Sequence, residues 1–446
     1  MPMDLDLIFG ASGTRFLLYP QAPVMRGYAA PEVVWVSPPA GSIAPGPADD
    51  RMYVVDPIGK QRLYEVPYLP PWRGPRHPPA PPGRDGHFDH LPTGSRAFLA
   101  AHMYGTVRRV LDVWEGYFGR RVEWQFRRHL PRLELIPLAE WDNAHSGYGF
   151  IETGTRAVPG EPPLHFCLSF DVLAHEIGHS LIFAEIGVPV ARFRTGEFLA
   201  FHEAAADLAA LIAVLHFDMV IDRLLERTHG NLYVPTMLSR IGELSEHEQI
   251  REVDHDVVMA DLAAVGFDPA TGEWSDAAGL GRQAHELSQP LTGAVFDILV
   301  DVFERRVVEL GLFSPEIDRM IRSAGRADVN LAHLDEVVSI AWRQDPPAFR
   351  RALLDARDHV GLCLAGTWSL LEAEHLDFGD VAAAFILAER KVSGGLYRDL
   401  VTAGFAKRGI LPSRRFGDPG VSLAAALQAP NPLARRAGVP PFPLRA

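Results

Sequence analysis

Residues 171–183 read DVLAHEIGHSLIF and are predicted to form a helix that is buried on all sides. His175 and His179 are four residues apart, so on a helix their imidazoles lie one above the other and can hold one zinc ion. Glu176 lies roughly 100° round the helix from His175, close enough to such an ion to take a proton from a water molecule without binding the metal. Because the flanks are apolar, these ionisable groups need buried partners, and a metal ion is one.

A third protein ligand is expected on the next helix, where residues 198–211 read FLAFHEAAADLAAL. Glu203 and Asp207 share one face of that helix, and two buried carboxylates are costly unless a cation meets them. We predict that Glu203 binds zinc and that Asp207 accepts the second ring N–H of a ligand histidine. His202 and Glu197 are rival third ligands, and a solvated acidic edge is the alternative interpretation of the carboxylate pair.

The pattern His-Glu-x-x-His followed by Glu-x-x-x-Asp resembles the gluzincin zinc metallopeptidases, and the wider sequence resembles their thermolysin-like members. The resemblance implies a peptidase with one zinc ion on His175, His179 and Glu203, in which Glu176 is the general base. It also implies that the partner is a peptide or protein substrate.

Three further segments resemble parts of the same family. Asn143 and Ala144, followed by a Tyr-Gly pair, resemble the edge strand whose backbone holds an extended substrate. The sequence around His285 resembles the segment of the catalytic histidine, which implies that His285 donates a hydrogen bond to the oxyanion of the reaction. Arg240 resembles the family's arginine that binds a substrate carbonyl group.

The sequence also departs from the family. Val214 and Leu215 occupy the stretch where the family carries calcium-binding acids, so calcium is in doubt, and Arg194 stands near the position of the family's catalytic tyrosine. A zinc-binding protein without peptidase activity, kept as a binding or assembly module, is therefore an alternative. A helical interaction protein without a metal is another. An aminopeptidase would need an extra acid for the substrate amine, for which Glu152 and Glu197 are available.

The periodicity of apolar residues predicts an α+β fold, with a β-containing N-terminal lobe, a mainly helical C-terminal lobe and the zinc site in the cleft between them. The predicted parts are an irregular N-terminal arm (1–48), the β-containing lobe (49–190), the helical lobe (191–412) and an irregular tail (413–446). Strands are expected at 52–68, 121–126, 132–137 and 147–152. Helices are expected at 95–119, 170–185, 197–217, 235–245, 290–310, 315–323, 332–342, 347–371, 379–390 and 394–407.

The composition limits the partners. The 446 residues carry 43 basic and 56 acidic side chains, a net charge of −13, which argues against nucleic acid or an anionic membrane as the main partner. No apolar run is long enough to span a bilayer and no secretory leader is visible, so a cytoplasmic protein is expected. Cys167 and Cys363 are expected to be buried free thiols. The oligomeric state stays open.

Overall fold

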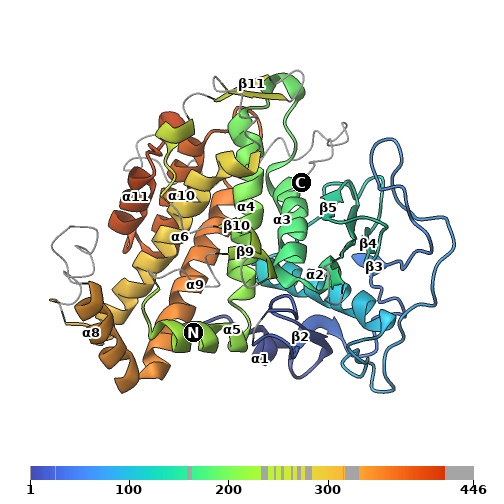
Figure 1. Cartoon of the computed structure of the whole chain (residues 1–446). Helices are drawn as coiled ribbons and strands as arrows, with labels where there is room; N and C mark the ends of the chain where they lie inside the picture. Colours follow the sequence, from blue (N-terminus) through green and yellow to red (C-terminus); the bar gives the residue numbers. More distant parts are fainter. Residues whose placement is uncertain are drawn as a thin grey trace.

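The computed structural model describes residues 2–25, 27–157, 163–232, 240–245, 248–252, 256–262, 265–268, 273–276, 284–314, 316 and 331–416. Helices and small sheets are combined in one mixed α+β arrangement, as predicted, with the four-stranded main sheet on one side of the molecule and most helices on the other (Figure 1). Within the described part, no single helix is long and apolar enough to cross a membrane; α4 (Gly196–Val214) and α5 (Asp218–Thr228) pass that test only together, bent by 91°.

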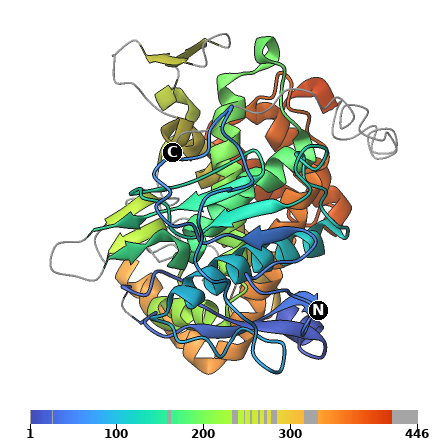
Figure 2. The ribbon, with the colours of Figure 1, turned by 90° about the vertical axis from the view of Figure 1, so that its right-hand side faces the viewer.

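The main sheet has four strands in the order β3 (Met52–Val54), β4 (Leu133–Ile136), β6 (Phe150–Thr153) and β5 (Ala144–Gly147). β4 is parallel to both of its neighbours, whereas β5 is antiparallel to β6 and ends the sheet. Helix α2 (Arg96–Phe118) runs along one face of the sheet (Figures 1 and 2), where Leu135 and Ile151 are fully buried. Because side chains alternate along a strand, Ile136 and Phe150 point to the other face, which the loop around Tyr64 covers.

Helices α3 (Phe170–Ile186) and α4 pack against each other over most of their length. Small residues allow this close approach: a Cβ added at Gly178 would lie 2.9 Å from Ala206 Cα and 3.2 Å from Ala209 Cβ. Thr195 caps the start of α4, accepting a hydrogen bond from the Phe198 N–H. The two helices are thereby fixed in the register that brings their polar residues together.

The other helices complete the core. Trp114 on α2 and Trp368 on α9 (Pro346–Trp368) contact each other with ring centroids 4.4 Å apart, which joins the sheet side of the molecule to the helical side. Further helices in the described part of the chain are α6 (Ala284–Glu309), α8 (Leu331–Gln344), α10 (Phe378–Ser393) and α11 (Arg398–Lys407). Cys167 and Cys363 are both buried and free, which confirms that prediction.

The predicted helices at 95–119 and 170–185 are confirmed, but the irregular N-terminal arm is wrong. Residues 1–48 contain a short helix, α1 (Leu5–Phe9), and an antiparallel pair, β1 (Gly13–Leu18) and β2 (Glu32–Pro39). Phe16 and Val34 from this pair are buried in the main core. The apolar alternation of these strands is short and lies between proline-rich and glycine-rich stretches, which hid it.

Three other predictions of local structure are wrong. The predicted helix at 235–245 contains β9 (Arg240–Ser245), which pairs with β10 (Glu248–Glu252); Gly242 disfavours a helix there, and pairing across the turn gives a hairpin. A second hairpin, β11 (Val265–Asp268) with β12 (Glu273–Asp276), lies within the mainly helical 191–412 region. The described chain has no strand at 121–126 or 62–66, where aromatic side chains are buried without a partner strand.

A further short antiparallel pair of strands is β7 (Thr155–Arg156) with β8 (Leu164–His165). The predicted helix at 315–323 and the tail beyond residue 416 lie outside the described residues, except for Glu316.

Candidate metal centre

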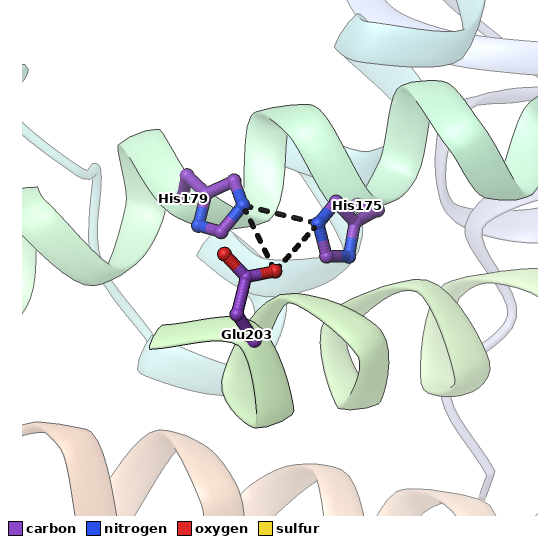
Figure 3. A group of neighbouring side chains, drawn as sticks. All are labelled: His175, His179 and Glu203. Carbon is purple, nitrogen blue, oxygen red and sulfur yellow. Dashed lines mark hydrogen bonds and ion pairs between the residues drawn. The ribbon is translucent and has the colours of Figure 1, made fainter. Parts of the chain in front are cut away.

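Two side chains from α3 and one from α4 converge between the helices. His175 and His179 lie one turn apart on the face of α3 that meets α4, and Glu203 points up to them from α4 (Figure 3). All three residues are buried, with exposed fractions of 3%, 6% and 3%. Their ligand atoms lie within 4.8 Å of one another, close enough for the three side chains to hold one metal ion.

The three donor atoms form a triangle whose size suits a small divalent cation. His175 Nε2 lies 3.0 Å from His179 Nε2 and 3.4 Å from Glu203 Oε2, and His179 Nε2 lies 3.8 Å from the same oxygen. An ion held tetrahedrally at about 2.1 Å separates its ligand atoms by about 3.4 Å. Two imidazole nitrogens and one carboxylate oxygen therefore fit a metal ion with little rearrangement, and they leave a fourth position for another ligand.

The charge of the group is suited to a cation. Burial by itself would raise the pKa of Glu203, but the neighbouring His179 and hydrogen bonds from His175 and His285 hold it well below its usual range. Glu203 is thus a buried carboxylate that stays ionised. A buried charge of this kind is stable only where positive or hydrogen-bonding groups surround it.

A second set of contacts orients the two imidazoles. Asp207 lies one turn after Glu203 on α4, and its Oδ1 is 2.7 Å from His175 Nδ1. The Nδ1 atoms of His179 and His202 are 3.4 Å apart, and burial lowers the pKa of His202 well below its usual range, so His202 is neutral. These contacts suit the tautomers with a proton on Nδ1 of each α3 histidine, in which Nε2 faces the triangle and is open to a metal.

His202 was predicted as a rival ligand and not as a partner of His179. Its ring packs between Phe183, at a centroid distance of 4.1 Å, and Phe198, at 5.0 Å. His202 lies directly before Glu203 on α4. This position, next to a predicted metal ligand, is the sequence signal that could have revealed its contact with His179.

Glu176 shares α3 with the two histidines. It is 5% exposed, and its carboxylate forms no ion pair or hydrogen bond with the residues that the structure describes. A buried carboxylate of this kind, next to His175 in the chain, has no structural bond to break before it accepts a proton.

His285, in the first turn of α6, reaches the same group from a third helix. Its Nδ1 lies 2.7 Å from Glu203 Oε2, and its ring centroid is 6.4 Å from that of His175. The side chain is 22% exposed, so it stands at the open margin of the buried triad. The predicted catalytic histidine is therefore close to the metal ligands, but in this structure it contacts Glu203.

The predicted substrate strand lies beside α3. β5 is the end strand of the sheet and contacts α3, and Ala144 is its first residue. Asn143 precedes it, and its Oδ1 accepts a hydrogen bond from the Ala144 N–H at 2.8 Å. Arg240 is the first residue of β9, a strand that contacts both α3 and α4, but its side chain lies outside the described part of the chain.

The two acids considered for a substrate amine are both engaged elsewhere. Glu152 is fully buried in an ion pair with Lys60 and lies 2.9 Å from His145 Nε2. Glu197 accepts a hydrogen bond of 2.6 Å from the Phe378 N–H at the start of α10. Glu197 is also not among the residues that converge on the triad.

Comparison with known proteins adds no relative. No protein-family model matches the chain, and none of the curated proteins matches it either. The interpretation of the site therefore depends on its own geometry.

Proposed function

We propose that the protein is a zinc-dependent peptidase of the gluzincin type, with a thermolysin-like division into two lobes around α3 and α4. The observation that carries this proposal is the triangle of His175 Nε2, His179 Nε2 and Glu203 Oε2, with an uncommitted carboxylate, Glu176, on the same helix. A structural zinc site has four protein ligands, whereas a catalytic site keeps one position open. The described chain supplies three ligands, as a catalytic site requires.

His175, His179 and Glu203 would hold the zinc ion, while Asp207 and His202 keep the imidazoles turned toward it. When bound, zinc would act as a Lewis acid that activates water and polarises a carbonyl group. Glu176 would serve as the base, because its buried carboxylate has no ion pair or hydrogen bond to break among the described residues. Glu176 takes the proton and then delivers it to the leaving amine as the peptide bond breaks.

The substrate would bind as an extended strand. β5 ends the sheet next to α3, so a peptide could add to its outer edge by main-chain hydrogen bonds, with Asn143 and Ala144 at the near end. His285 stands at the margin of the triad, and in this role it exchanges its contact with Glu203 for a hydrogen bond to the substrate carbonyl oxygen.

Hydrolysis of a peptide library by the zinc-loaded wild type and by Glu176→Gln tests the proposal. We expect cleavage by the wild type and a loss of at least about 100-fold in kcat for the variant, because a general base typically contributes 10²–10⁴-fold. Zinc content should be equal in the two proteins. No cleavage by the zinc-loaded wild type would favour the alternative, a zinc-binding module without peptidase activity.

Endopeptidase activity is the favoured form. Glu152 and Glu197 are both bound to other groups, so neither is free to hold a substrate amine. Peptides with acetylated N-termini should therefore be cleaved as well as free ones. Cleavage restricted to free N-termini would show an aminopeptidase.

A further inference from the structure

A cavity of about 410 Å³ opens at the β3 end of the main sheet, whereas the metal centre lies beside β5 at the other end. Its lining residues come from the segments 45–56, 76–80 and 96–100, together with Arg132. Pockets of this size hold small organic molecules. Nothing in the proposed peptidase chemistry uses it.

The charged residues of this cavity are mostly arginines. Arg76, Arg96 and Arg132 line it together with a single acid, Asp56. Arg96 is paired with Asp56 by two hydrogen bonds of 2.5 and 2.6 Å, which leaves two positive charges in excess. The net charge of the protein is −13, so the positive charge of this cavity is opposite in sign to that of the protein as a whole.

Arg76 and Arg132 have no carboxylate partner among the described residues. Arg132 donates to the backbone oxygen of Asp49 at 3.1 Å, and its guanidinium lies over the ring of Tyr53, 4.5 Å from the centroid. Arg76 forms no side-chain ion pair or hydrogen bond in this part of the chain and is exposed at the cavity rim. Two guanidinium groups without acids offer several N–H donors to an anion, in the fork geometry that suits phosphate and carboxylate.

The start of α2 adds to the positive potential. Arg96 and Ala97, the first two residues of this 23-residue helix, both line the cavity. Backbone N–H groups in the first turn of a helix have no intrahelical acceptor, and the helix dipole places partial positive charge there. His77 also lines the cavity, and the described chain gives it no metal-binding partners.

Much of the rest of the wall is apolar and includes Pro45, Pro78, Pro79, Ala80, Ala97 and Ala100. An inorganic ion would leave this surface uncovered. We propose that the cavity binds a small organic anion, whose phosphate or carboxylate group contacts Arg76 and Arg132 and whose apolar body packs against the proline and alanine wall.

Calorimetric titration at low ionic strength tests this inference with four probes: phenyl phosphate, benzoate, inorganic phosphate and neutral benzyl alcohol. We expect phenyl phosphate or benzoate to bind best, and the better of the two identifies the anionic group. Inorganic phosphate should bind more weakly because it lacks the apolar body, and benzyl alcohol should bind most weakly because it lacks the charge. Raising the salt concentration should weaken the binding of both organic anions.

The variants Arg76→Gln and Arg132→Gln should each weaken binding of the better organic anion by about tenfold, since each removes a charge-assisted contact. Arg73→Gln is the matched control, because Arg73 is exposed in the same loop but does not line the cavity. Arg76 is exposed as well, so its variant should fold even if Arg132→Gln does not. Binding is measured on metal-free protein, so the result is independent of peptidase activity. Three results would each overturn the inference. These are binding of benzyl alcohol as strong as that of the organic anions, unchanged affinity of Arg76→Gln for the better organic anion, and no binding of either organic anion at millimolar concentrations.

Discussion

Replacing Asp207 tests how the site is organised, because this residue would not bind the proposed metal itself but would orient the metal ligand His175. Its Oδ1 lies 2.7 Å from His175 Nδ1, and its side chain is only 3% exposed, so the contact is short, charged and shielded from water. Loss of such a partner typically lowers metal affinity 10–100-fold, which corresponds to about 1.4–2.7 kcal/mol. We expect a loss near the lower figure for Asp207→Asn, whose amide oxygen still accepts a hydrogen bond, and near the higher figure for Asp207→Ala.

The assay is competition for zinc against a chromophoric chelator at pH 7.5, with circular dichroism to verify the fold. Glu197→Gln is the matched control, because Glu197 is a partly buried acid on the same helix that binds the Phe378 N–H and not the metal group. It should keep wild-type affinity. Wild-type zinc affinity in both folded Asp207 variants, or an equal loss in Glu197→Gln, would refute this account of the orientation of His175.

Three further changes test the fold around the site. Gly178→Ala should destabilise the protein by about 1–3 kcal/mol and also weaken zinc binding, because the added Cβ pushes α3 away from Ala206. The control is Gly366→Ala, whose Cβ would lie 2.9 Å from Ala388 Cβ between α9 and α10. It should destabilise the protein without changing the zinc affinity. Lys60→Met should lower the free energy of unfolding by about 3–5 kcal/mol in urea titrations, because it leaves the buried Glu152 carboxylate without its ammonium partner. The double variant with Glu152→Gln should recover most of this loss, and no recovery would contradict the account. Burial lowers the pKa of His102 to about 4 from 6.5, so the unfolded chain binds the proton first, and stability is full above pH 6.5 and falls by up to about 3 kcal/mol as the pH drops toward 4. Thermal melts should show a weaker pH dependence for His102→Gln than for the wild type, and an unchanged dependence would be inconsistent with this role.

The part of the site that could be predicted from the sequence is the part set by local helix geometry. His175 and His179 share a face because they are four residues apart, and the same spacing places Asp207 one turn from Glu203. The cost of burying charges then indicated that the two helices face each other. The structure brings these four residues together, as the pattern indicated, while their roles with a metal stay predictions.

Contacts between distant segments could not be predicted in the same way. Pairing of β1 with β2 and of β9 with β10 depends on partners across a turn or loop, and weak local patterns did not reveal them. Glu152 was considered as an available acid for a substrate amine, and nothing in the sequence indicated its ion-pair partner Lys60, which lies far away along the chain. A charged residue in a strand can be matched with its ion-pair partner only when the fold is known.

The central claim is that His175, His179 and Glu203 together hold one zinc ion. Elemental analysis of the purified wild type, beside His179→Ala and Glu176→Gln, tests it most directly. We predict about one zinc per chain in the wild type and in Glu176→Gln, as expected for a single site with three protein ligands, and its loss in His179→Ala. A wild-type protein that contains no zinc and takes none up when it is supplied would contradict the account.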